Sequence, residues 1–498
     1  MNKPALLQLN PRDNTAVALR PLCAGETVLA GEIQITLTCD IPQAHKVALQ
    51  DIARGEDVIK YGAPIGHATQ AVLAGGHLHV HNLKTNLSGE LEYTYQPELH
   101  PVRYEKRGLT FQGYRRANGA AGIRNDLYIL PTVGCVNGTA EQMQRAYEVK
   151  YGPLDSVFDN VIVLKHPFGC SQLGDDHKST RRILADAALH PNAGGVLLVG
   201  LGCENNTMTQ LLEEMGSYDE ARIKWLVVQE VTDEIEAGAA LLHELAQAAQ
   251  NDRREPVPVS ELSIGLKCGG SDGLSGITAN PLLGALSDLM IAQGGSAVLT
   301  EVPEMFGAEQ VLMARARDEA VFGKTVELIN GFKAYFAAHN EPVYENPSPG
   351  NKAGGITTLE DKSLGCTQKS GTSEVVDVLS YGERLKEKGL SLLQAPGNDL
   401  VAASALACSG CQLVLFSTGR GTPFGAFVPT MKVSTNSQLY EKKPHWMDFN
   451  AGRLLEEPME MVLEDFLLAV LAVASGKSTR NEENKFSEIS IFKTGVTL

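Results

Sequence analysis

The sequence predicts an α/β protein in which a small β-rich module precedes a larger region with a mostly parallel sheet. From Tyr114 onward, apolar strand-like runs alternate with helical stretches, and this alternation is typical of βαβ units. The segment before residue 90 carries only short strand-like stretches. The chain has 498 residues, which exceeds one ordinary domain and predicts two or three domains with well-buried cores.

Two changes in composition predict the domain boundaries. Gly89–Gly113 is polar, rich in Tyr, Pro and charge, and typical of a linker. A second break lies at Asn251–Pro258. The predicted organisation is a β-rich domain at 1–90, a linker at 91–113, a first α/β part at 114–252 and a second α/β part at 258–498.

The expected elements follow in chain order. Strands of the N-terminal module are expected at Thr15–Ala18, Thr27–Ala30 and Ile33–Leu37. Helices are expected at Gly138–Lys150, Ser179–Leu189, Asp233–Gln250 and Pro281–Ala292, and later strands at Ala297–Thr300 and Leu413–Ser417. Asn346–Gly371 has too little apolar sequence to form a core, and its prolines and paired glycines predict a long, shaped loop.

Composition limits the class of partner and the compartment. A formal charge of −16 argues against nucleic acid and an anionic membrane as partners. Met1–Asn10 has no apolar core for export, and the apolar run Phe466–Ala474 is far too short to span a bilayer. We therefore expect a cytoplasmic protein. Its nine cysteines are then reduced thiols available for packing, metal binding or catalysis.

Four cysteines each close a short apolar run that is typical of a buried strand: Cys135, Cys170, Cys203 and Cys268. The ligand crevice of an open parallel sheet lies at the carboxyl ends of its strands, so these thiols are expected to converge on one place. Soft thiolates select iron, zinc or an iron–sulfur cluster, and three cysteines can hold a cubane cluster with one iron open. The alternative is four unrelated core cysteines, because cysteine is among the most buried residue types.

The remaining cysteines have weaker patterns. Cys408 and Cys411 form a CxxC pair, but Val401–Cys411 is expected to be helical before a strand, which favours core packing over a redox role. Cys366 lies in the polar glycine-rich segment, where it is a possible outlying metal ligand.

Three histidines alternate in the N-terminal module. His77, His79 and His81 would share one face of a strand, where neutral imidazoles can bind a divalent metal or accept a proton. The alternative is a set of exposed polar residues on the outer face of a sheet.

Glycine-rich turns supply the second group of candidate residues. Cys268–Gly276 follows a strand and precedes a helix, so its amides and the side chains of Ser271 and Asp272 can face an anion. Arg420 follows another strand and offers a fixed fork for a carboxylate. Connecting turns and a surface salt bridge are the alternatives.

Several motifs together resemble one family. HVHN, GCVNG, HPFGCSQLGDD, GLGCENN, CGGSDGLSGITANP, ENPSPGNKAGG, TTLEDKSLG and STGRGTP are similar to the altronate and galactarate dehydratase family, essentially from end to end. The resemblance implies an N-terminal β-clip domain of the SAF type and a Rossmann-like catalytic region. It also implies dependence on a divalent metal such as iron(II) or manganese, and an oligomeric enzyme, most simply a homodimer.

The resemblance further implies β-elimination of water from a sugar acid, D-altronate giving 2-dehydro-3-deoxy-D-gluconate. Galactarate or another aldarate is the alternative substrate, and a non-catalytic sugar-acid binding protein on the same fold is the alternative class. Such a reaction needs a stabilised aci-carboxylate, a departing hydroxide and a positioned acid and base.

Residue roles are assigned as a hypothesis. The metal, iron as Fe2+ or as an iron–sulfur cluster with Mn2+ as the alternative, is expected on Cys135, Cys170, Cys203, Cys268, His79 and His81. Proton transfer is expected from His79, His81, His166 and Lys352. Substrate binding is expected from Ser271, Asp272, Asn280, Asn351 and Arg420.

Overall fold

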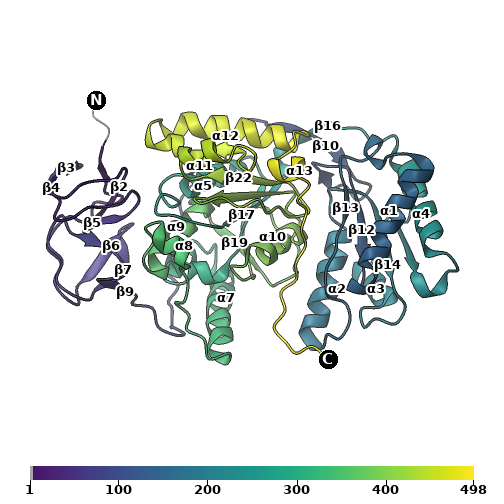
Figure 1. Ribbon diagram of the computed structural model, residues 1–498, viewed down its shortest axis with the longest axis horizontal. Coiled ribbons are helices and arrows are strands. Elements are labelled where there is room, and N and C mark those ends of the chain that lie inside the picture. The colour runs from purple at the N-terminus through teal and green to yellow at the C-terminus, as the bar shows by residue number, and fades with distance from the viewer. Residues whose placement is uncertain (1–3, 102) are drawn as a thin grey trace.

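A computed structural model describes residues 4–101 and 103–498, which form three parts set in a row (Figure 1). The N-terminal β domain lies at one end, a domain with a seven-stranded sheet in the centre, and a domain with a four-stranded sheet at the other end. Both larger sheets are parallel throughout. The predicted fold class, a small β module followed by a mostly parallel α/β region, is therefore confirmed.

The N-terminal domain is built from short antiparallel strands. They form three small sheets: β1 (Leu6–Leu7), β2 (Thr15–Ala18), β5 (Lys46–Ala48) and β8 (His77–Leu78); β3 (Thr27–Ala30) and β4 (Ile33–Thr36); and β6 (Asp57–Lys60), β7 (Ala63–Ala68) and β9 (Leu83–Lys84). Apolar side chains from these strands make two small cores. The predicted strands at 15–18 and 27–30 match exactly, because apolar residues and turn residues alternate clearly there.

The four-stranded domain has the strand order β13-β12-β14-β15. Its elements are β12 (Asp126–Pro131), α1 (Asn137–Tyr151), β13 (Val161–Val163), α2 (Gly174–Ala188), β14 (Ala193–Gly200), α3 (Met208–Met215), β15 (Ile223–Val227) and α4 (Glu234–Ala249). Helix α1 packs with α4 and α2 packs with α3, so helices cover both faces of the sheet. Strand β14 is consequently apolar along its whole length, as expected for a strand buried on both faces.

The seven-stranded domain has the order β19-β20-β18-β17-β21-β22-β23. Its strands are β17 (Ser263–Cys268), β18 (Ser296–Leu299), β19 (Val375–Leu379), β20 (Leu390–Leu393), β21 (Leu413–Thr418), β22 (Thr430–Ser434) and β23 (Phe449–Asn450). Its helices are α5 (Ala279–Ala292), α6 (Glu309–Met313), α7 (Glu319–Ala338), α8 (Pro349–Ala353), α9 (Leu359–Thr367), α10 (Asp399–Cys408), α11 (Ser437–Lys442), α12 (Met459–Ala474) and α13 (Arg480–Glu483). The chain leaves β17 first to one side and later to the other, so a crevice is expected between the carboxyl ends of β17 and β21.

A further sheet, of three strands, contains residues of the predicted linker and of the second predicted boundary. Strand β10 (Thr110–Arg115) pairs antiparallel with β11 (Ala121–Gly122) and with β16 (Glu255–Pro258). Part of the segment predicted as a boundary is thus a strand, although Pro256 and Pro258 cannot donate backbone hydrogen bonds. Strand β16 tolerates them because it lies at the edge of its sheet.

The segment 346–371, predicted as a loop, is mostly helical. Helix α8 begins after Ser348, whose side chain accepts a hydrogen bond from the Asn351 amide, and α9 begins after Thr358, which caps the Asp361 amide in the same way. The loop prediction was wrong because these helices carry polar side chains that are buried against other domains. Helix α10 confirms the helical prediction before β21, and Cys408 and Cys411 are buried in the core there. No helix among residues 4–101 and 103–498 combines the length and apolar character needed to cross a bilayer.

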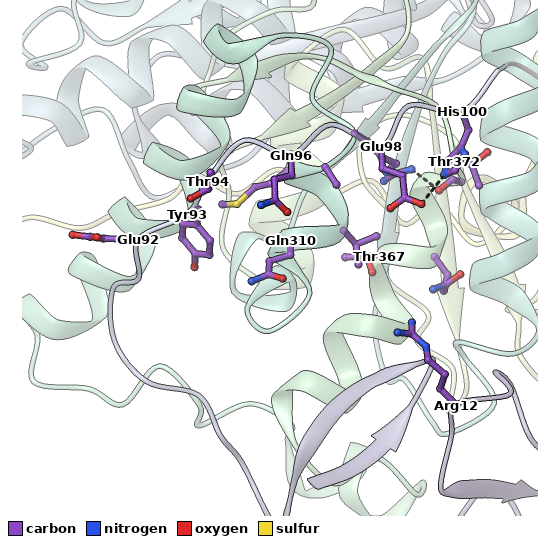
Figure 2. Close-up of a pocket in the computed structure, with 16 residues that line it drawn as sticks. Arg12, Glu92, Tyr93, Thr94, Gln96, Glu98, His100, Gln310, Thr367 and Thr372 are labelled. Atoms are coloured by element: carbon purple, nitrogen blue, oxygen red, sulfur yellow. Dashed lines mark hydrogen bonds and ion pairs between the residues drawn. The ribbon is translucent and has the colours of Figure 1, made fainter.

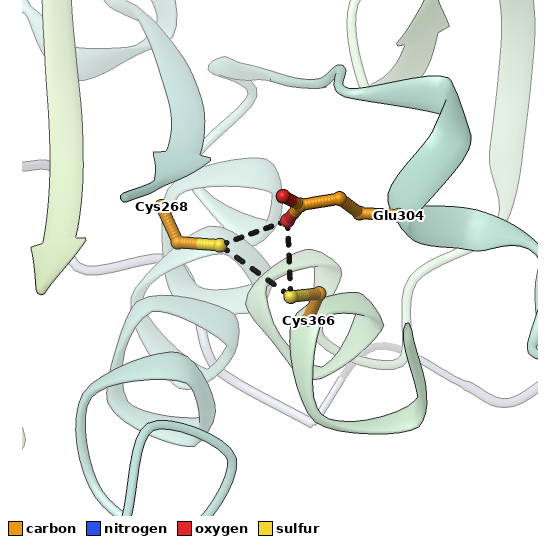
Figure 3. Close-up of side chains that lie close together, drawn as sticks. All are labelled: Cys268, Glu304 and Cys366. Carbon is orange, nitrogen blue, oxygen red and sulfur yellow. Dashed lines mark hydrogen bonds between the residues drawn. The ribbon is translucent and has the colours of Figure 1, made fainter. Parts of the chain in front are cut away.

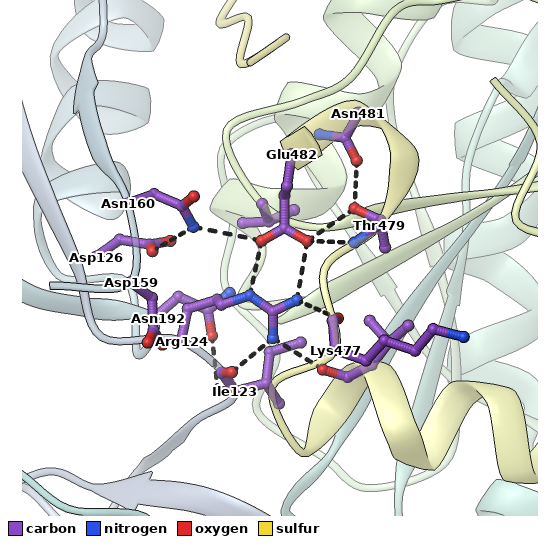
Figure 4. A network of polar contacts seen from close by, with 12 residues as sticks. Ile123, Arg124, Asp126, Asp159, Asn160, Asn192, Lys477, Thr479, Asn481 and Glu482 are labelled. Atoms are coloured by element: carbon purple, nitrogen blue, oxygen red, sulfur yellow. Dashed lines mark hydrogen bonds and ion pairs between the residues drawn. The ribbon is translucent and has the colours of Figure 1, made fainter. Parts of the chain in front are cut away.

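A buried ion pair joins the four-stranded and seven-stranded domains (Figure 4). Arg124, which precedes β12, donates to both carboxylate oxygens of Glu482 on α13, at 2.6 and 2.8 Å. The same guanidinium donates to the carbonyl oxygens of Ile123, Val473 and Lys477. Its side chain is only 2% exposed. A guanidinium can satisfy five acceptors at once, so the joint depends on arginine specifically.

We expect Arg124→Lys to weaken this joint by about 2–4 kcal/mol, because an ammonium has three donors and leaves buried acceptors unpaired. The change is measured by urea denaturation followed through the fluorescence of Trp225 on β15, in a Trp446→Phe background. Arg107→Lys is the matched control, since Arg107 makes the same two-fold contact with Glu464 but is 39% exposed. Equal midpoints for the two variants would contradict the prediction.

Candidate functional site

The four strand-end cysteines do not share one site. Cys135, Cys170 and Cys203 follow β12, β13 and β14, and all three are exposed. Cys268 ends β17 in the other parallel sheet and is buried. The expectation of a single centre for all four thiols overlooked that two separate sheets each have their own carboxyl edge.

Cys268 instead meets Cys366 and Glu304 (Figure 3). The two sulfur atoms are 3.4 Å apart, and each lies 3.2 Å from Oε2 of Glu304. Glu304 lies in the turn of 3-10 helix after β18, and Cys366 near the end of α9. Among the described residues, this is the one group of three metal-ligating side chains whose ligand atoms all lie within 4.8 Å of one another.

Buried lysines surround this triangle. Lys362, one turn before Cys366 on α9, donates to Oε1 of Glu304 at 2.7 Å. Lys267 contacts Glu301 and Asp399, and Lys369 contacts the other oxygen of Glu301. Three ammonium groups therefore face three carboxylates, and the formal charges of these six groups cancel. A buried network of this kind is tolerated only because every charge has a partner.

The protonation states agree with this balance. Burial would raise the pKa of Glu304, but the charges of Lys362 and Lys369 overcome it and lower the pKa to about 2. The pKa of the Cys366 thiol is raised well above its usual range by its hydrogen bond with Cys268 and by burial. Glu304 is thus an anion and Cys366 a neutral thiol near pH 7.

The donor set fits a divalent cation. Thiolates at about 2.3 Å from one tetrahedral ion lie about 3.8 Å apart, so the observed pair needs to move only by tenths of an ångström. Two sulfurs and one carboxylate oxygen favour Fe2+ over Mn2+, which prefers oxygen ligands. Both sulfurs bind a metal as thiolates, so binding would release the proton of the Cys366 thiol. His79 and His81 do not belong to this group of ligand atoms.

A second buried charge group fastens the N-terminal domain beside the triangle. Asp361 on α9 accepts from Lys46 on β5 at 2.8 Å and from Lys60 on β6 at 2.9 Å. Burial would raise the pKa of Asp361, but the two ammonium charges hold it well below its usual range. Burial and the Lys60 charge lower the pKa of Lys46 to about 8, although Asp361 opposes them. Two cations share one anion, so one positive charge is in excess at this contact.

Glycines allow the two domains to approach closely. A Cβ at Gly273 would lie 2.2 Å from the carbonyl oxygen of Ala44, and one at Gly355 would lie 2.4 Å from the same oxygen. A Cβ at Gly276 would lie 2.2 Å from the hydroxyl of Tyr61. The glycines of the segment 268–276 therefore serve domain contact, in addition to the tight turn that the sequence predicted.

The predicted histidines form a cluster with a fourth, His45. Strand β8 ends at Leu78, so His81 lies in the following turn and the predicted three-residue strand face is wrong. The rings still meet: Nδ1 of His45 and Nε2 of His77 are 3.0 Å apart, and His79 contacts the hydroxyl of Thr357 at 3.0 Å. Burial and neighbouring positive charges lower the pKa of His77 to about 4 and of His79 to about 3.

Four of the five predicted substrate residues, all except Asn351, line a narrow cavity or the groove beside it. Ser271, Asp272 and Asn280 line a narrow cavity together with Lys60, Lys362 and Cys366. Asp272 also borders an open groove of about 330 Å³ whose wall includes Arg420, Asn436 and Lys442. The groove lies at the carboxyl ends of β17 and β21, where the strand order predicts a crevice.

Only some of these side chains remain available to a substrate. The hydroxyl of Ser271 is buried and has no hydrogen-bond partner among the described residues. Asn280 donates to the Gly365 carbonyl and accepts from Ser417, and Asn351 is bonded in the α8 cap and to the Ser271 carbonyl. These two asparagines therefore help to hold the frame of the site.

Asp272 and Arg420 also differ in how many of their polar groups are already bonded within the protein. The carboxylate of Asp272 accepts hydrogen bonds from Ser275, Thr435 and Asn436, so it holds the loops in place. Arg420 is exposed and spends one donor on the carbonyl oxygen of Gly350, at 3.1 Å. Its other donors are available to a carboxylate.

None of the four predicted proton-transfer residues lines the narrow cavity or the groove, and His166 and Lys352 lie apart from the histidine cluster as well. His166 is buried in the four-stranded domain, where Nε2 contacts the carbonyl oxygen of Pro131 and Nδ1 accepts from the Phe168 amide. The catalytic prediction for His166 does not fit, because both ring nitrogens are held by backbone. Lys352 is partly exposed on α8, next to the domain contact but not in the lining of the cavity.

A cleft of about 780 Å³ lies elsewhere (Figure 2). Linker residues such as Tyr93 and Glu98 face Gln310 and Thr367 there, with Arg12 of the N-terminal domain at the rim. It contains no cysteine and none of the predicted site residues. Its chemistry therefore gives no reason to place the site there.

Sequence patterns missed several site residues. Glu301 and Glu304 lie just after the apolar run 297–300. A position after a strand was the signal that pointed to the cysteines, and it applies equally to these two glutamates. Lys46, Lys60 and Asp361 carry no pattern, because their pairing joins segments about 300 residues apart in the chain. Cys366 was weighed as an outlying ligand within a loop, but it lies on α9.

Acid is expected to loosen the N-terminal domain. Because the pKa values of His77 and His79 are lowered in the folded chain, the unfolded chain binds more protons below pH 6.5, and the stability of the folded state falls as pH drops towards 4. The thermal midpoint of His77→Gln should depend less on pH in this window. His67→Gln is the control, since His67 contacts Asn86 and no imidazole. Identical pH profiles in all three chains would refute the prediction.

Comparisons with known proteins agree with this architecture. Family models match residues 4–86 as the altronate/galactarate dehydratase SAF domain, 113–250 as the second domain of D-galactarate dehydratase/altronate hydrolase, and 259–497 as the C-terminal domain of D-galactarate/altronate dehydratase. An altronate dehydratase of Bacillus subtilis (strain 168) is 59% identical over 99% of this chain and 100% of that protein. One of Escherichia coli (strain K12) is 56% identical over 99% of both. A galactarate dehydratase (L-threo-forming) of the same strain is 34% identical, over 95% of this chain and 93% of that protein. The chain belongs to the altronate/galactarate dehydratase family.

Proposed function

We propose that the chain is a hydro-lyase that converts D-altronate to 2-dehydro-3-deoxy-D-gluconate and water in hexuronate breakdown. The carrying observation is the buried Cys268–Glu304–Cys366 triangle below a groove that presents Arg420, in a chain similar over its full length to altronate dehydratases. The greater distance to galactarate dehydratase favours altronate over galactarate as the substrate.

Binding of the sugar acid follows from charge and free hydrogen-bonding groups. The free donors of Arg420 suit the carboxylate, and the excess positive charge of Lys46 and Lys60 favours an anion beside it. The unpartnered hydroxyl of Ser271 offers a donor to a hydroxyl of the substrate. Substrate enters through the groove because the inner cavity is closed by the N-terminal domain.

Elimination removes a proton from the carbon beside the carboxylate and a hydroxide from the next carbon, and the resulting enol becomes the keto acid. We assign proton acceptance to the histidine cluster. Burial lowers the pKa of His45, His77 and His79, so these rings are neutral near pH 7, and His45 follows the groove-lining Ala44 in the chain.

A divalent ion, Fe2+ in preference to Mn2+, would be held by Cys268, Glu304 and Cys366. When bound it would supply a Lewis acid that stabilises the aci-carboxylate and the leaving hydroxide. Homodimer formation and a cytoplasmic location complete the proposal, the latter because the buried thiol pair needs a reducing compartment.

Ser271→Ala should lower kcat/KM for D-altronate by roughly tenfold, the value of one hydrogen bond, without lowering the thermal midpoint. Stability should persist because the hydroxyl has no partner within the described protein to lose. Ser417→Ala is the opposite control: its hydroxyl donates to Asn280 at 2.6 Å, so its loss should lower the midpoint. Unchanged kinetics in Ser271→Ala would remove Ser271 from the substrate site.

The function is tested with the full chain and ferrous iron under argon, offered D-altronate, galactarate and other aldonates. We expect the 2-keto acid to form fastest from D-altronate. Cys366→Ser should lose bound Fe2+ and at least about 100-fold in kcat/KM, whereas Cys411→Ser, which changes another buried thiol, should keep both. Keto acid formed from no substrate would favour a binding protein. Full activity of Cys366→Ser would exclude the thiol site.

A further inference from the structure

The three exposed cysteines of the four-stranded domain lie at one edge of one sheet. Cys135, Cys170 and Cys203 follow β12, β13 and β14, and these strands are neighbours in the order β13-β12-β14. The chain runs from β12 to one side and from β14 to the other, so the strand order places a ligand crevice between their carboxyl ends. One thiol is therefore supplied by each of three adjoining loops at the expected ligand position.

Backbone hydrogen bonds lock these loops together. The Gly134 amide, next to Cys135, donates to the Phe168 carbonyl at 2.9 Å, and the Asn206 amide donates to the Gly169 carbonyl at 3.0 Å. The Ser171 amide, next to Cys170, donates to Oδ1 of Asn205 at 2.8 Å. The loop bearing Cys170 is thus tied to both of its neighbours, and the thiols sit on a rigid frame.

His166 sets the spacing of the first two loops. Its ring bridges the carbonyl oxygen of Pro131 at the end of β12 and the amide of Phe168, two residues before Cys170. In addition, Nδ2 of Asn137 donates to the His166 carbonyl at 3.0 Å. The buried imidazole therefore holds the strand end before Cys135 and the segment before Cys170 at a fixed separation.

The exposure of these thiols is unusual. Of the nine cysteines, all within the described residues, four are exposed, and three of those four lie at this edge. Cysteine is normally among the most buried residue types, so three open thiols together need a ligand to cover them. Buried amides beside them also lack partners within the described chain: Oδ1 of Asn206, which is 0% exposed, and Nε2 of Gln172, which is 3% exposed.

Spacing selects the class of ligand. Thiolates bound to one tetrahedral ion lie about 3.8 Å apart, as in a zinc site. Among the described residues, only Cys268, Glu304 and Cys366 come within 4.8 Å of one another as a group, so the three loop thiols are set wider than the ligands of one ion. Thiolates that bind different irons of a cluster stand further apart, because the sulfides lie between the irons.

We propose that Cys135, Cys170 and Cys203 bind a cubane iron–sulfur cluster through three of its irons. The fourth iron is left for an oxygen ligand, such as a carboxylate or a hydroxyl. Each thiol loses one proton on binding. A cubane in its dication state contains two ferrous and two ferric ions with four sulfides, so a mixture of both ions and sulfide assembles it without a further oxidant. This site is separate from the Cys268–Glu304–Cys366 triangle and does not depend on the proposed elimination.

Acid-labile sulfide is the deciding measurement, because a lone ion in the buried triangle contributes iron but no sulfide. The full chain is purified and reconstituted under argon with ferrous and ferric iron, sulfide and a thiol reductant. We expect about four sulfides per chain, broad visible absorption from sulfide-to-iron charge transfer, and a paramagnetic signal after one-electron reduction. The triple variant Cys135→Ser, Cys170→Ser, Cys203→Ser should lose all three signals.

Two controls separate this proposal from others. Cys23→Ser removes the remaining exposed thiol, and Cys366→Ser disables the buried triangle; both should keep full sulfide. Near-ultraviolet circular dichroism checks that each variant folds. If the triple variant does not fold, the single variant Cys170→Ser replaces it. We expect Cys170→Ser to lose at least half of the sulfide. Sulfide that is absent from the native chain, or retained in the triple variant, would overturn the proposal, as would zinc bound in place of iron. If Cys366→Ser loses dehydratase activity but keeps its sulfide, the result supports a cluster that is separate from the buried triangle.

Discussion

The shared carboxylate of Asp361 is the contact on which the proposed site depends. It holds Lys46 and Lys60 of the N-terminal domain at 2.8 and 2.9 Å, all three side chains being almost fully buried. Asp361 belongs to α9, which also carries Lys362 and Cys366. Helix α9 therefore both binds the N-terminal domain and positions the Cys366 thiol. A shift of the N-terminal domain would move α9 and, with it, the buried triangle. A buried charge set is costly unless it is fully paired, and this one keeps one cation in excess where an anionic substrate would bind.

Topology imposes the second constraint. A parallel sheet gathers the residues that follow its strands at one edge, and this chain has two such sheets, each with its own switch point. The four cysteines that follow apolar strand-like runs are consequently divided between the two sheets: three lie at the four-stranded sheet and one at the seven-stranded sheet. The one in the central domain finds a second thiol and a carboxylate from other segments. The three in the outer domain remain together, open and unaccompanied by acidic ligands of comparable closeness among the residues described.

Local patterns predicted most elements and failed where contacts join distant segments. The strand before Cys135, which ends at Pro131, and the strand that ends at Cys268 were evident from continuous apolar runs, and α10 was evident before β21. Helix α9 lies in a segment predicted as a loop, because its buried side chains are polar and their partners are distant in sequence, in the N-terminal domain and in the central domain. The choice between one thiol site and two could not be made, since strand-end position does not say to which sheet a strand belongs. The amides of Asn280 and Asn351, predicted to bind substrate, each donate to a backbone carbonyl of the protein frame.

The close approach at Ala44 has a practical consequence for genetics. Its carbonyl oxygen meets Gly273 at a separation that leaves no room for a methyl group. Such a methyl would act as a wedge between the front and central parts of the molecule, while every thiol, lysine and imidazole stayed chemically intact. A chain carrying it would suit use as a conditional allele, in which cold favours the assembled form and warmth releases the front part.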